Sequence, residues 1–222
     1  MDREAFHELY GLTPETFKAE LIDGEVHVAS PVSARHGAPH ANLIGWMFIY
    51  MSETPDVEVY DNTTSVLDGE SETQPDAAMR ILEACGGQTR VDADGYIRGA
   101  PELVVEVAQS TASIDLGKKK TAYEKAGVRE YLVASLKEKT AHWFARRAAG
   151  FEPIAATRNG ILRSECFPGL WLAERDFFES RIGIFIEKLR RGLASPEHAA
   201  FVAELNSRRK KLTAKSKRRP KS

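Results

Sequence analysis

Three charged residues in the sequence stand where a charge needs a partner. Glu106 lies inside the apolar run LVVEVA, Asp76 follows a proline at the start of another apparent strand, and Lys119 is the middle one of three consecutive lysines. A buried carboxylate is costly unless a base or a cation accompanies it. Two carboxylates that converge would offer the hard oxygen ligands that Mg²⁺ prefers.

Such a group of residues could hydrolyse a phosphodiester. A bound Mg²⁺ lowers the pKa of a water ligand and stabilises charge on the scissile phosphate. A lysine beside it would orient or deprotonate that water and stabilise the transition state. Asp76 and Glu106 are therefore the candidate metal ligands, and Lys119 is the third candidate catalytic residue.

Each of these residues also has an ordinary explanation. Glu106 could lie at the solvated end of its strand or be neutralised by a buried base. Asp76 could be a solvated residue after a strand-entry proline, since proline favours extended geometry before it. Lys119 could cover apolar surface with its methylene groups while its charge reaches water. The combination of the three favours the catalytic interpretation over these alternatives.

The elements that carry these residues can be predicted from local patterns. PELVVEVA (101–108) is typical of a central strand that is buried on both faces. Asp115 is expected to cap a helix over 116–126, which Gly127 would end. With about 100° per residue, Lys119 lies on the sheet-facing side of that helix between Tyr123 and Ala126, whereas the preceding lysine points to solvent.

The remaining pattern predicts an α/β or α+β fold, with a mixed sheet flanked by helices. Asp23-Gly24 is a strong hairpin signal, and Ser33 is expected to cap a helix with Leu43 and Met47 on its apolar face. Beyond Trp171 the pattern is helical, and a last helix is predicted with Ser195 as its cap. Further strands are expected at 57–60, 64–68, 129–135, 140–145 and 151–154.

Length and composition predict one domain with a short appendage. The chain has 222 residues, of which 42% are hydrophobic, enough for a substantial core. It contains no apolar run near the ~20 residues that span a bilayer, and its acidic, amphipathic start does not resemble a signal peptide, so a cytoplasmic protein is expected. Cys85 and Cys166 form no CxxC pair, which favours two reduced thiols over a disulfide or a structural zinc site.

The net charge of −1 hides an asymmetry. From Ser207 to Ser222 there are nine basic residues and no acidic one; removing these nine from the 31 basic residues leaves 22 against 32 acidic ones. An acidic body is a poor electrostatic surface for nucleic acid. The tail 207–222 is expected to be disordered. It could aid solubility, or it could bind phosphates through Arg208–Lys221; sequence-specific recognition is the least favoured of the three.

Several stretches, in their order along the chain, resemble the Uma-type family of restriction endonucleases in the PD-(D/E)XK nuclease superfamily. These are ELIDGEV (20–26), PVSARH (31–36), QPD (74–76), PELVVEV (101–107), STASIDLGKK (110–119), YEKAGVREYLV (123–133) and FPGLWL (167–172). The resemblance implies a restriction-endonuclease-like fold over residues 1–175. A helical extension would follow at 176–206, and then the basic tail.

The resemblance also implies roles for individual residues. Asp76 and Glu106 would bind Mg²⁺, with Mn²⁺ as a substitute, and Lys119 would replace the usual superfamily lysine, whose position holds Ala108. Glu20 would be a further catalytic carboxylate, although it could also be an exposed residue at the hairpin entry. In addition, His36 could touch phosphate or only pack, and Gln74 could line the pocket. Two histidines, His36 and His40, have a spacing found in zinc sites, but HGAPH lacks the catalytic glutamate of HExxH and contains a proline, so zinc is disfavoured.

The expected function is therefore metal-dependent hydrolysis of DNA, and fold analogy suggests a homodimer. One alternative is an inactive module that binds nucleic acid or protein and keeps the nuclease fold. Another is a phosphoesterase that acts on RNA or a small nucleotide, since no feature of the sequence separates DNA from RNA.

Overall fold

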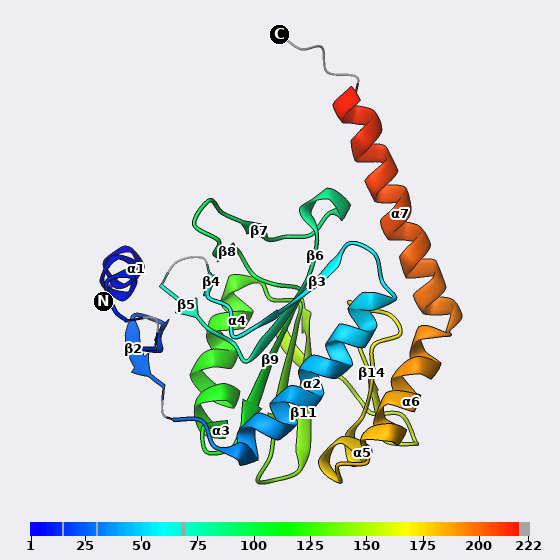
Figure 1. Ribbon diagram of the computed structural model, residues 1–222, viewed down its shortest axis with the longest axis horizontal. Coiled ribbons are helices and arrows are strands. Elements are labelled where there is room, and N and C mark those ends of the chain that lie inside the picture. Colours follow the sequence, from blue (N-terminus) through cyan, green and yellow to red (C-terminus); the bar gives the residue numbers. More distant parts are fainter. Residues whose placement is uncertain (15, 30, 68–69, 218–222) are drawn as a thin grey trace.

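A computed structural model describes residues 1–14, 16–29, 31–67 and 70–217 of the chain. Its centre is a six-stranded mixed sheet (Figure 1). In spatial order the strands are β12 (Gly150–Pro153), β11 (Thr140–Arg147), β10 (Glu130–Ser135), β9 (Leu103–Ala108), β6 (Ala77–Ile81) and β3 (Val57–Asp61). Strands β9 and β10 are parallel, and the other neighbours are antiparallel.

Strand β9 is buried along its whole length, as the apolar run predicts. Leu103, Val105 and Val107 belong to the main core, which α2 (Ala34–Ser52), α5 (Glu174–Phe178) and α6 (Ile182–Leu193) cover. The alternate residues Val104 and Ala108 pack on the opposite side of the sheet, against Tyr123. Glu106 shares this second face because side chains alternate along a strand.

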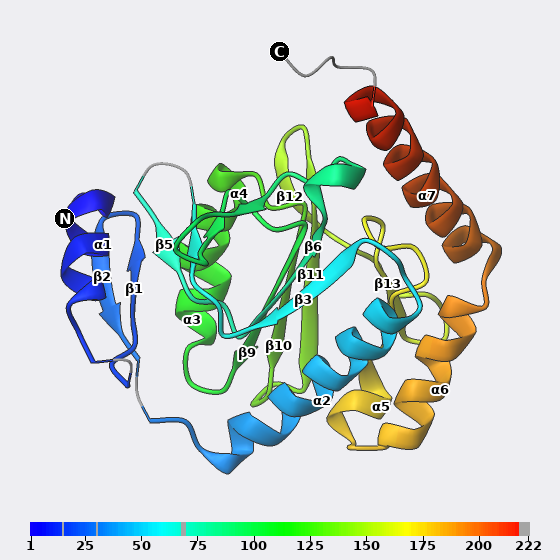
Figure 2. The same cartoon turned by 45° about the horizontal axis from the view of Figure 1, so that its top comes forward.

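A second sheet, which contains the predicted hairpin, lies beside the first (Figure 2). Its strands in spatial order are β2 (Glu25–Val28), β1 (Ala19–Ile22), β5 (Glu72–Thr73), β4 (Ser65–Val66), β8 (Ile97–Arg98) and β7 (Arg90–Val91). Asp23 and Gly24 both have positive φ, 47° and 78°, as the favoured two-residue hairpin turn requires. Helix α1 (Arg3–Gly11) packs on β1 through Phe6.

The helical segment after β9 differs from its prediction. It consists of α3 (Ala112–Ile114), a π-helical turn (η2, Asp115–Lys119) and α4 (Lys120–Ala126), which ends at Gly127 with φ 93°. Asp115 is therefore not the cap but lies within the segment. The amides of Ile114 and Asp115 already donate to the carbonyl of Thr111, so the helical turns begin earlier and the Asp115 side chain is directed inward.

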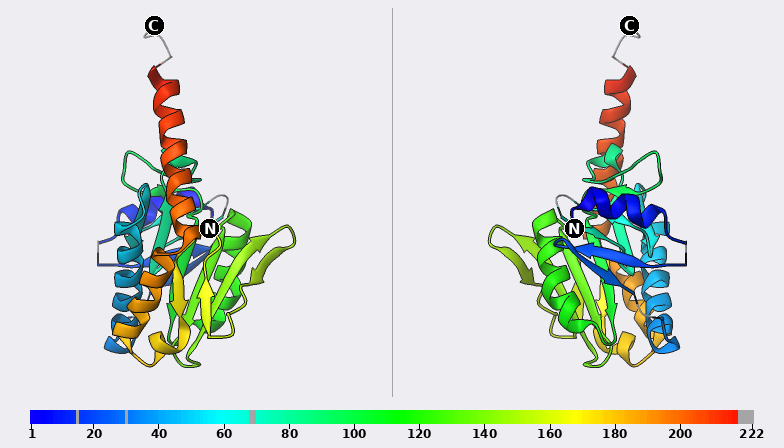
Figure 3. Two further views of the ribbon diagram at one scale, coloured as in Figure 1. Left: turned by 90° about the vertical axis from the view of Figure 1, so that its right-hand side faces the viewer. Right: turned by 90° about the vertical axis from the view of Figure 1, so that its left-hand side faces the viewer.

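The C-terminal helices pack onto the main core. The remaining short elements are η1 (Glu83–Cys85), β13 (Ile161–Arg163) and β14 (Trp171–Ala173). Helix α7 (Pro196–Lys217) extends past the body of the molecule (Figure 3). Phe185 of α6 and both Phe201 and Leu205 of α7 are buried in the core. The predicted cap is present, since Ser195 Oγ accepts from the amide of His198.

The tail expected to be disordered from residue 207 is helical as far as Lys217, and residues 218–222 lie outside the described part. Arg208 donates to the carbonyl of Cys85 at 3.0 Å and pairs with Glu204 one turn earlier, while Arg209 pairs with Asp56. Lysine, arginine and alanine are good helix formers, and they extend a helix that is already anchored to the core.

Two further observations concern membrane-spanning helices and the state of the cysteines. In the described ranges, none of the helices combines the length and apolarity needed to cross a bilayer. Cys85 and Cys166 are free thiols, as expected.

Candidate active site

The structure brings Glu20, Glu106 and Lys119 together. The Nζ atom of Lys119 lies 2.8 Å from Oε2 of Glu20 and 2.9 Å from Oε1 of Glu106. Glu20 comes from β1, Glu106 from β9 and Lys119 from the π-helical turn, so three elements meet here. Lys119 is only 7% exposed and Glu106 only 4%, so water screens the interaction between these charges only weakly.

Asp76 joins this site from the start of β6. Its Oδ2 accepts from the amide of Val107 at 2.7 Å and from Nε2 of His36 at 3.2 Å. Burial alone would raise the pKa of Asp76, but these hydrogen bonds, the one from His36 first, outweigh burial and leave the pKa below its ordinary value. Asp76 is therefore an ionised carboxylate beside Glu106, as a metal ligand must be.

The electrostatics of the site are dominated by excess negative charge. Burial raises the pKa of Glu106 well above its ordinary value; Lys119 opposes that shift, whereas Asp76, Glu20 and Asp115 add to it by repulsion. Burial would lower the pKa of Lys119, but Glu106, Glu20 and Asp115 together raise it. Lys119 is therefore a stable ammonium group that donates hydrogen bonds, and it has no free electron pair with which to act as a base.

Two residues of the site were missed by sequence reasoning. Asp115 lies 4.0 Å from Lys119 Nζ, one helical turn earlier, and accepts from Thr111 Oγ1 at 2.6 Å. Tyr123 donates its hydroxyl to Glu106 Oε1 at 3.0 Å. The spacing Asp115–Lys119 was a usable signal, but assigning the aspartate as a helix cap concealed it.

Gln74 contacts the site through its backbone amide. Its amide donates to Oε1 of Glu20 at 2.7 Å, which fixes the carboxylate that faces Lys119. Its side-chain Nε2 donates instead to the carbonyl of Asn62 at 2.6 Å. Glu20 is thus a partly buried member of the site and not an exposed residue at the hairpin entry.

The two histidines of α2 also face Asp76. Besides its contact with the carboxylate, His36 has a pKa above its ordinary value, chiefly because of the hydrogen bond to Asp76, with burial opposing the shift. His40 donates from Nε2 to the carbonyl oxygen of Asp76 at 2.8 Å, and the same nitrogen lies 3.1 Å from Oδ1 of Asp61. His36 therefore contacts the site itself rather than only packing.

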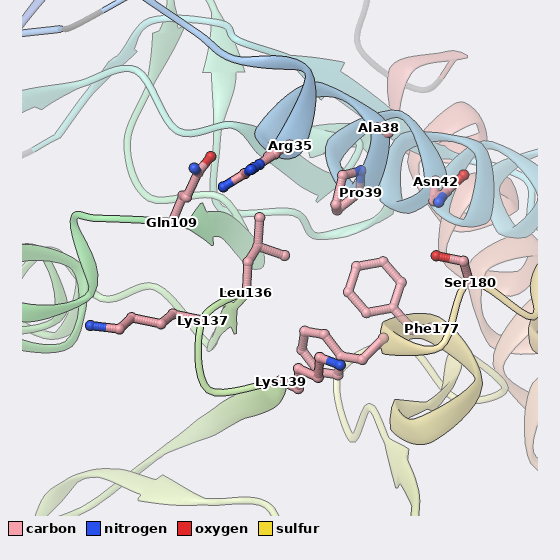
Figure 4. A pocket seen from close by; sticks show the side chains of 11 residues that line it. Arg35, Ala38, Pro39, Asn42, Gln109, Leu136, Lys137, Lys139, Phe177 and Ser180 are labelled. Atoms are coloured by element: carbon pink, nitrogen blue, oxygen red, sulfur yellow. The ribbon is translucent and has the colours of Figure 1, made fainter.

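A pocket of about 490 Å³ opens on a neighbouring face of α2. Figure 4 shows Arg35 and Gln109 on one side of it and Phe177 on the other. Lys137 and Lys139 also line it, but none of the four site carboxylates does. Because Arg35 directly precedes His36, the pocket and the site share the first turn of α2.

Comparison with known proteins places the chain in a family. Residues 3–175 match the family model Uma2, described as a putative restriction endonuclease. The chain belongs to this family. Membership confirms the resemblance seen in the sequence and indicates nuclease activity. No curated protein is significantly similar to the chain.

A solved structure confirms the fold. The crystal structure of a putative nuclease of the DUF820 group from Anabaena variabilis ATCC 29413 superimposes with a TM-score of 0.59. The match covers 84% of this chain and 97% of that one, at 14% sequence identity. The chain therefore has the restriction-endonuclease-like fold, with a mixed sheet flanked by helices.

Proposed function

We propose that this protein is a Mg²⁺-dependent endonuclease that hydrolyses DNA phosphodiester bonds, with Asp76 and Glu106 as metal ligands and with Lys119 and Glu20 as further catalytic residues. The observation that carries the proposal is the Lys119 ammonium group held between Glu20 and Glu106, next to the ionised Asp76. A family of nucleases supplies the reaction class, and this geometry supplies the residues.

The residues present fit a hard divalent cation. Glu106 interacts with Asp76, Glu20 and Asp115, so acids exceed bases in a largely buried site. Mg²⁺ prefers carboxylate oxygens and retains waters that substrate can displace, and Mn²⁺ accepts the same ligands. Such a cation would offset the repulsion among these acids, which Lys119 alone does not fully offset.

Each side chain then has a distinct task. Asp76 and Glu106 would hold the cation, which would supply a water of lowered pKa and neutralise phosphate charge. Lys119 donates hydrogen bonds to the oxygens on which negative charge develops. The hydroxyl of Tyr123 orients Glu106, and the amide of Gln74 orients Glu20.

The pocket beside the site is the proposed binding surface for the nucleic acid. Arg35, Lys137 and Lys139 are exposed cations around it, and phosphate contacts of this kind supply most nonspecific affinity for DNA. Phe177 and Phe178 give its wall an aromatic character. This local positive surface compensates for the acidic body.

We also propose that two copies act together, because nucleases of this fold often pair to cut both strands; this step rests on fold analogy. Light scattering during size-exclusion chromatography measures the mass directly. A mass of twice 24.7 kDa is expected, and a monomer at cleavage-competent concentration would contradict this part.

The test of the activity is plasmid cleavage. Supercoiled plasmid is incubated with Mg²⁺ or Mn²⁺ and the wild-type protein, Asp76→Asn or Lys119→Met. Loss of a group that stabilises transition-state charge is expected to slow cleavage by at least about 100-fold. The matched control is Lys118→Met, which removes the neighbouring exposed lysine and should cleave normally.

Two outcomes would overturn the proposal. Cleavage that is undiminished in both variants would remove these residues from the mechanism. A wild-type protein that neither cleaves plasmid nor binds Mg²⁺ at millimolar concentration would instead be an inactive binding module. RNA and cyclic nucleotides, offered under the same conditions, test the choice of DNA.

A further inference from the structure

The first turns of α2 place two histidines against one aspartate. One nitrogen from each of His36 and His40 and one carboxylate oxygen of Asp76 all lie within 4.8 Å of one another. Two ligands of a single cation, bound at ~2.1 Å each, lie at most about 4.2 Å apart. Small side-chain rotations would therefore let all three groups contact one ion.

Two features of the sequence argued against zinc here, but neither excludes an ion at this place. Pro39 does not break the helix, because α2 continues through it and keeps His36 and His40 one turn apart on the same face. The glutamate that HGAPH lacks is a catalytic base and not a ligand in HExxH, so its absence does not prevent ion binding. Asp76, thirty-six residues beyond His40, supplies a third ligand group.

The position of the Asp76 carboxylate does not depend on the two histidines. Oδ2 of Asp76 is already fixed by the amide of Val107 at 2.7 Å, so it is positioned without either histidine. His40 moreover has a second carboxylate, that of Asp61, at 3.1 Å. Two imidazoles and the carboxylate of Asp76 therefore meet in one partly buried place, where they offer nitrogen and oxygen ligands to a cation.

We propose that His36, His40 and Asp76 form a binding site for a borderline divalent transition-metal ion such as Zn²⁺ or Co²⁺, distinct from the carboxylate site of Glu106. Imidazole nitrogen suits these ions, whereas Mg²⁺ takes oxygen ligands almost exclusively. Two histidines and one carboxylate also leave coordination positions open to water or phosphate oxygen.

This site goes beyond the proposed nuclease activity, although the two share Asp76. A carboxylate has two oxygens, so Asp76 can serve both ions. Ion binding can be measured on the intact protein without any substrate. Failure of the transition-metal site and failure of the nuclease proposal are therefore separate results.

The test is Co²⁺ binding to the metal-free full-length protein, followed by visible absorption, with Zn²⁺ as competitor. Wild type is expected to bind one Co²⁺ that Zn²⁺ displaces. His36→Ala and His40→Ala should each weaken binding by at least about tenfold, since even losing a ligand's supporting partner costs that much. The matched control is His142→Ala, which removes a histidine on β11 that is paired with Glu138.

The carboxylates separate the two sites. Glu106→Gln should keep Co²⁺ binding while losing Mg²⁺ binding, whereas Asp76→Asn should lose both. Co²⁺ binding that is absent at millimolar concentration, or equally strong in both histidine variants, would overturn the proposal and leave the histidines as hydrogen-bond donors only.

A second measurement uses the wild-type protein and avoids any folding defect of the variants. Zn²⁺ is titrated into ¹⁵N-labelled protein while the histidine ring nitrogens are followed by NMR. The proposal requires that His36 and His40 shift together at one equivalent. Shifts at any of the other four histidines instead would contradict it (His7, His27, His142 and His198).

Discussion

Strands β9 and β10 bury carboxylates at two places, and the neighbours of those carboxylates differ completely. Near the start of the strands, Glu102 and Glu130 are at most 1% exposed and are surrounded by neutral donors. Glu130 accepts from Ser164 Oγ and from the amides of Glu165 and Cys166, each at 2.7 Å. Further along β9, Glu106 is also buried but is crowded by charged groups.

The difference teaches how to distinguish structural from functional buried acids. A carboxylate whose lone pairs are all used by neutral donors is satisfied and holds the fold together. Glu102 does this by bonding the amides of Ile81 and Gln88, both at 2.9 Å. A carboxylate among other carboxylates, with one shared lysine, carries repulsion that a cation or substrate can relieve.

The largest expected effect is on catalysis at Glu106. Glu106→Gln should reduce plasmid cleavage by at least about 100-fold. The midpoint temperature of thermal unfolding should not fall, because the substitution removes one member of a group of acids that repel one another. Cleavage assays and calorimetry on the same preparation measure both quantities. A strongly destabilised variant would show that Glu106 is structural, like Glu130, and would break the comparison.

The converse change is expected at Glu130. Glu130→Ala leaves the Ser164 hydroxyl, two backbone amides and the Trp143 indole without their acceptor. Unpaired buried donors cost about 1–3 kcal/mol each, with partial relaxation, so a loss of roughly 3 kcal/mol in unfolding free energy is expected. Urea unfolding measures it. Cleavage per folded molecule should stay near the wild-type rate; a specific loss of activity would place Glu130 in the mechanism.

Positive charge shows the same division. Lys119 is enclosed by acids, whereas Arg35, Lys137 and Lys139 are exposed around the pocket. Reversing Lys137 and Lys139 to glutamate should weaken DNA binding by about tenfold or more at low salt. It should also reduce the slope of the logarithm of the binding constant against the logarithm of the salt concentration by roughly 0.9 per lost phosphate contact. Fluorescence anisotropy with a labelled duplex measures this.

The matched control for a single reversal, Lys137→Glu, is Arg158→Glu, which reverses an exposed arginine that does not line the pocket. Equal weakening by the control would show that net charge, and not the pocket, governs affinity. Truncation after Leu212 tests the tail separately. It keeps Arg208 and Arg209, which hold α7 to the body through Cys85 and Asp56, so a loss of affinity would not reflect unfolding.

Local sequence patterns predicted most of what positions the site. The apolar run placed Glu106 in a buried strand, and helical periodicity selected Lys119 from three lysines. Those arguments work because strand and helix periods decide which way a side chain points. They also gave the hairpin of β1 and β2, since Asp-Gly specifies its turn.

What the patterns missed depends on contacts or register. Asp115 precedes most of a helical segment and so resembles a cap; only the π-helical turn shows that it faces Lys119. The role of His40 could not be predicted because its contacts to Asp76 and Asp61 form only in the folded chain. The helix beyond residue 207 was missed because it depends on anchoring contacts to the body, which its composition does not reveal.

The smallest expected effect concerns pH and the structural carboxylate. Burial raises the pKa of Glu130 above its ordinary value of 4.5, although Ser164 and the two amides offset part of the shift. Between 4.5 and the raised pKa, the folded protein binds more protons than the unfolded chain, so unfolding free energy falls as pH rises through this window.

Glu130→Gln lacks this titration and so isolates it. The stability of wild type relative to the variant should decrease as pH rises above 4.5, by about 1.4 kcal/mol for each unit by which folding raises the pKa, and then level off. Urea unfolding of both proteins at half-unit pH steps measures the difference. A difference that does not vary with pH would mean that the neutral donors fully compensate for burial. The contrast with Glu106 would then be sharper still, because burial and the neighbouring acids raise the pKa of that carboxyl well above its ordinary value.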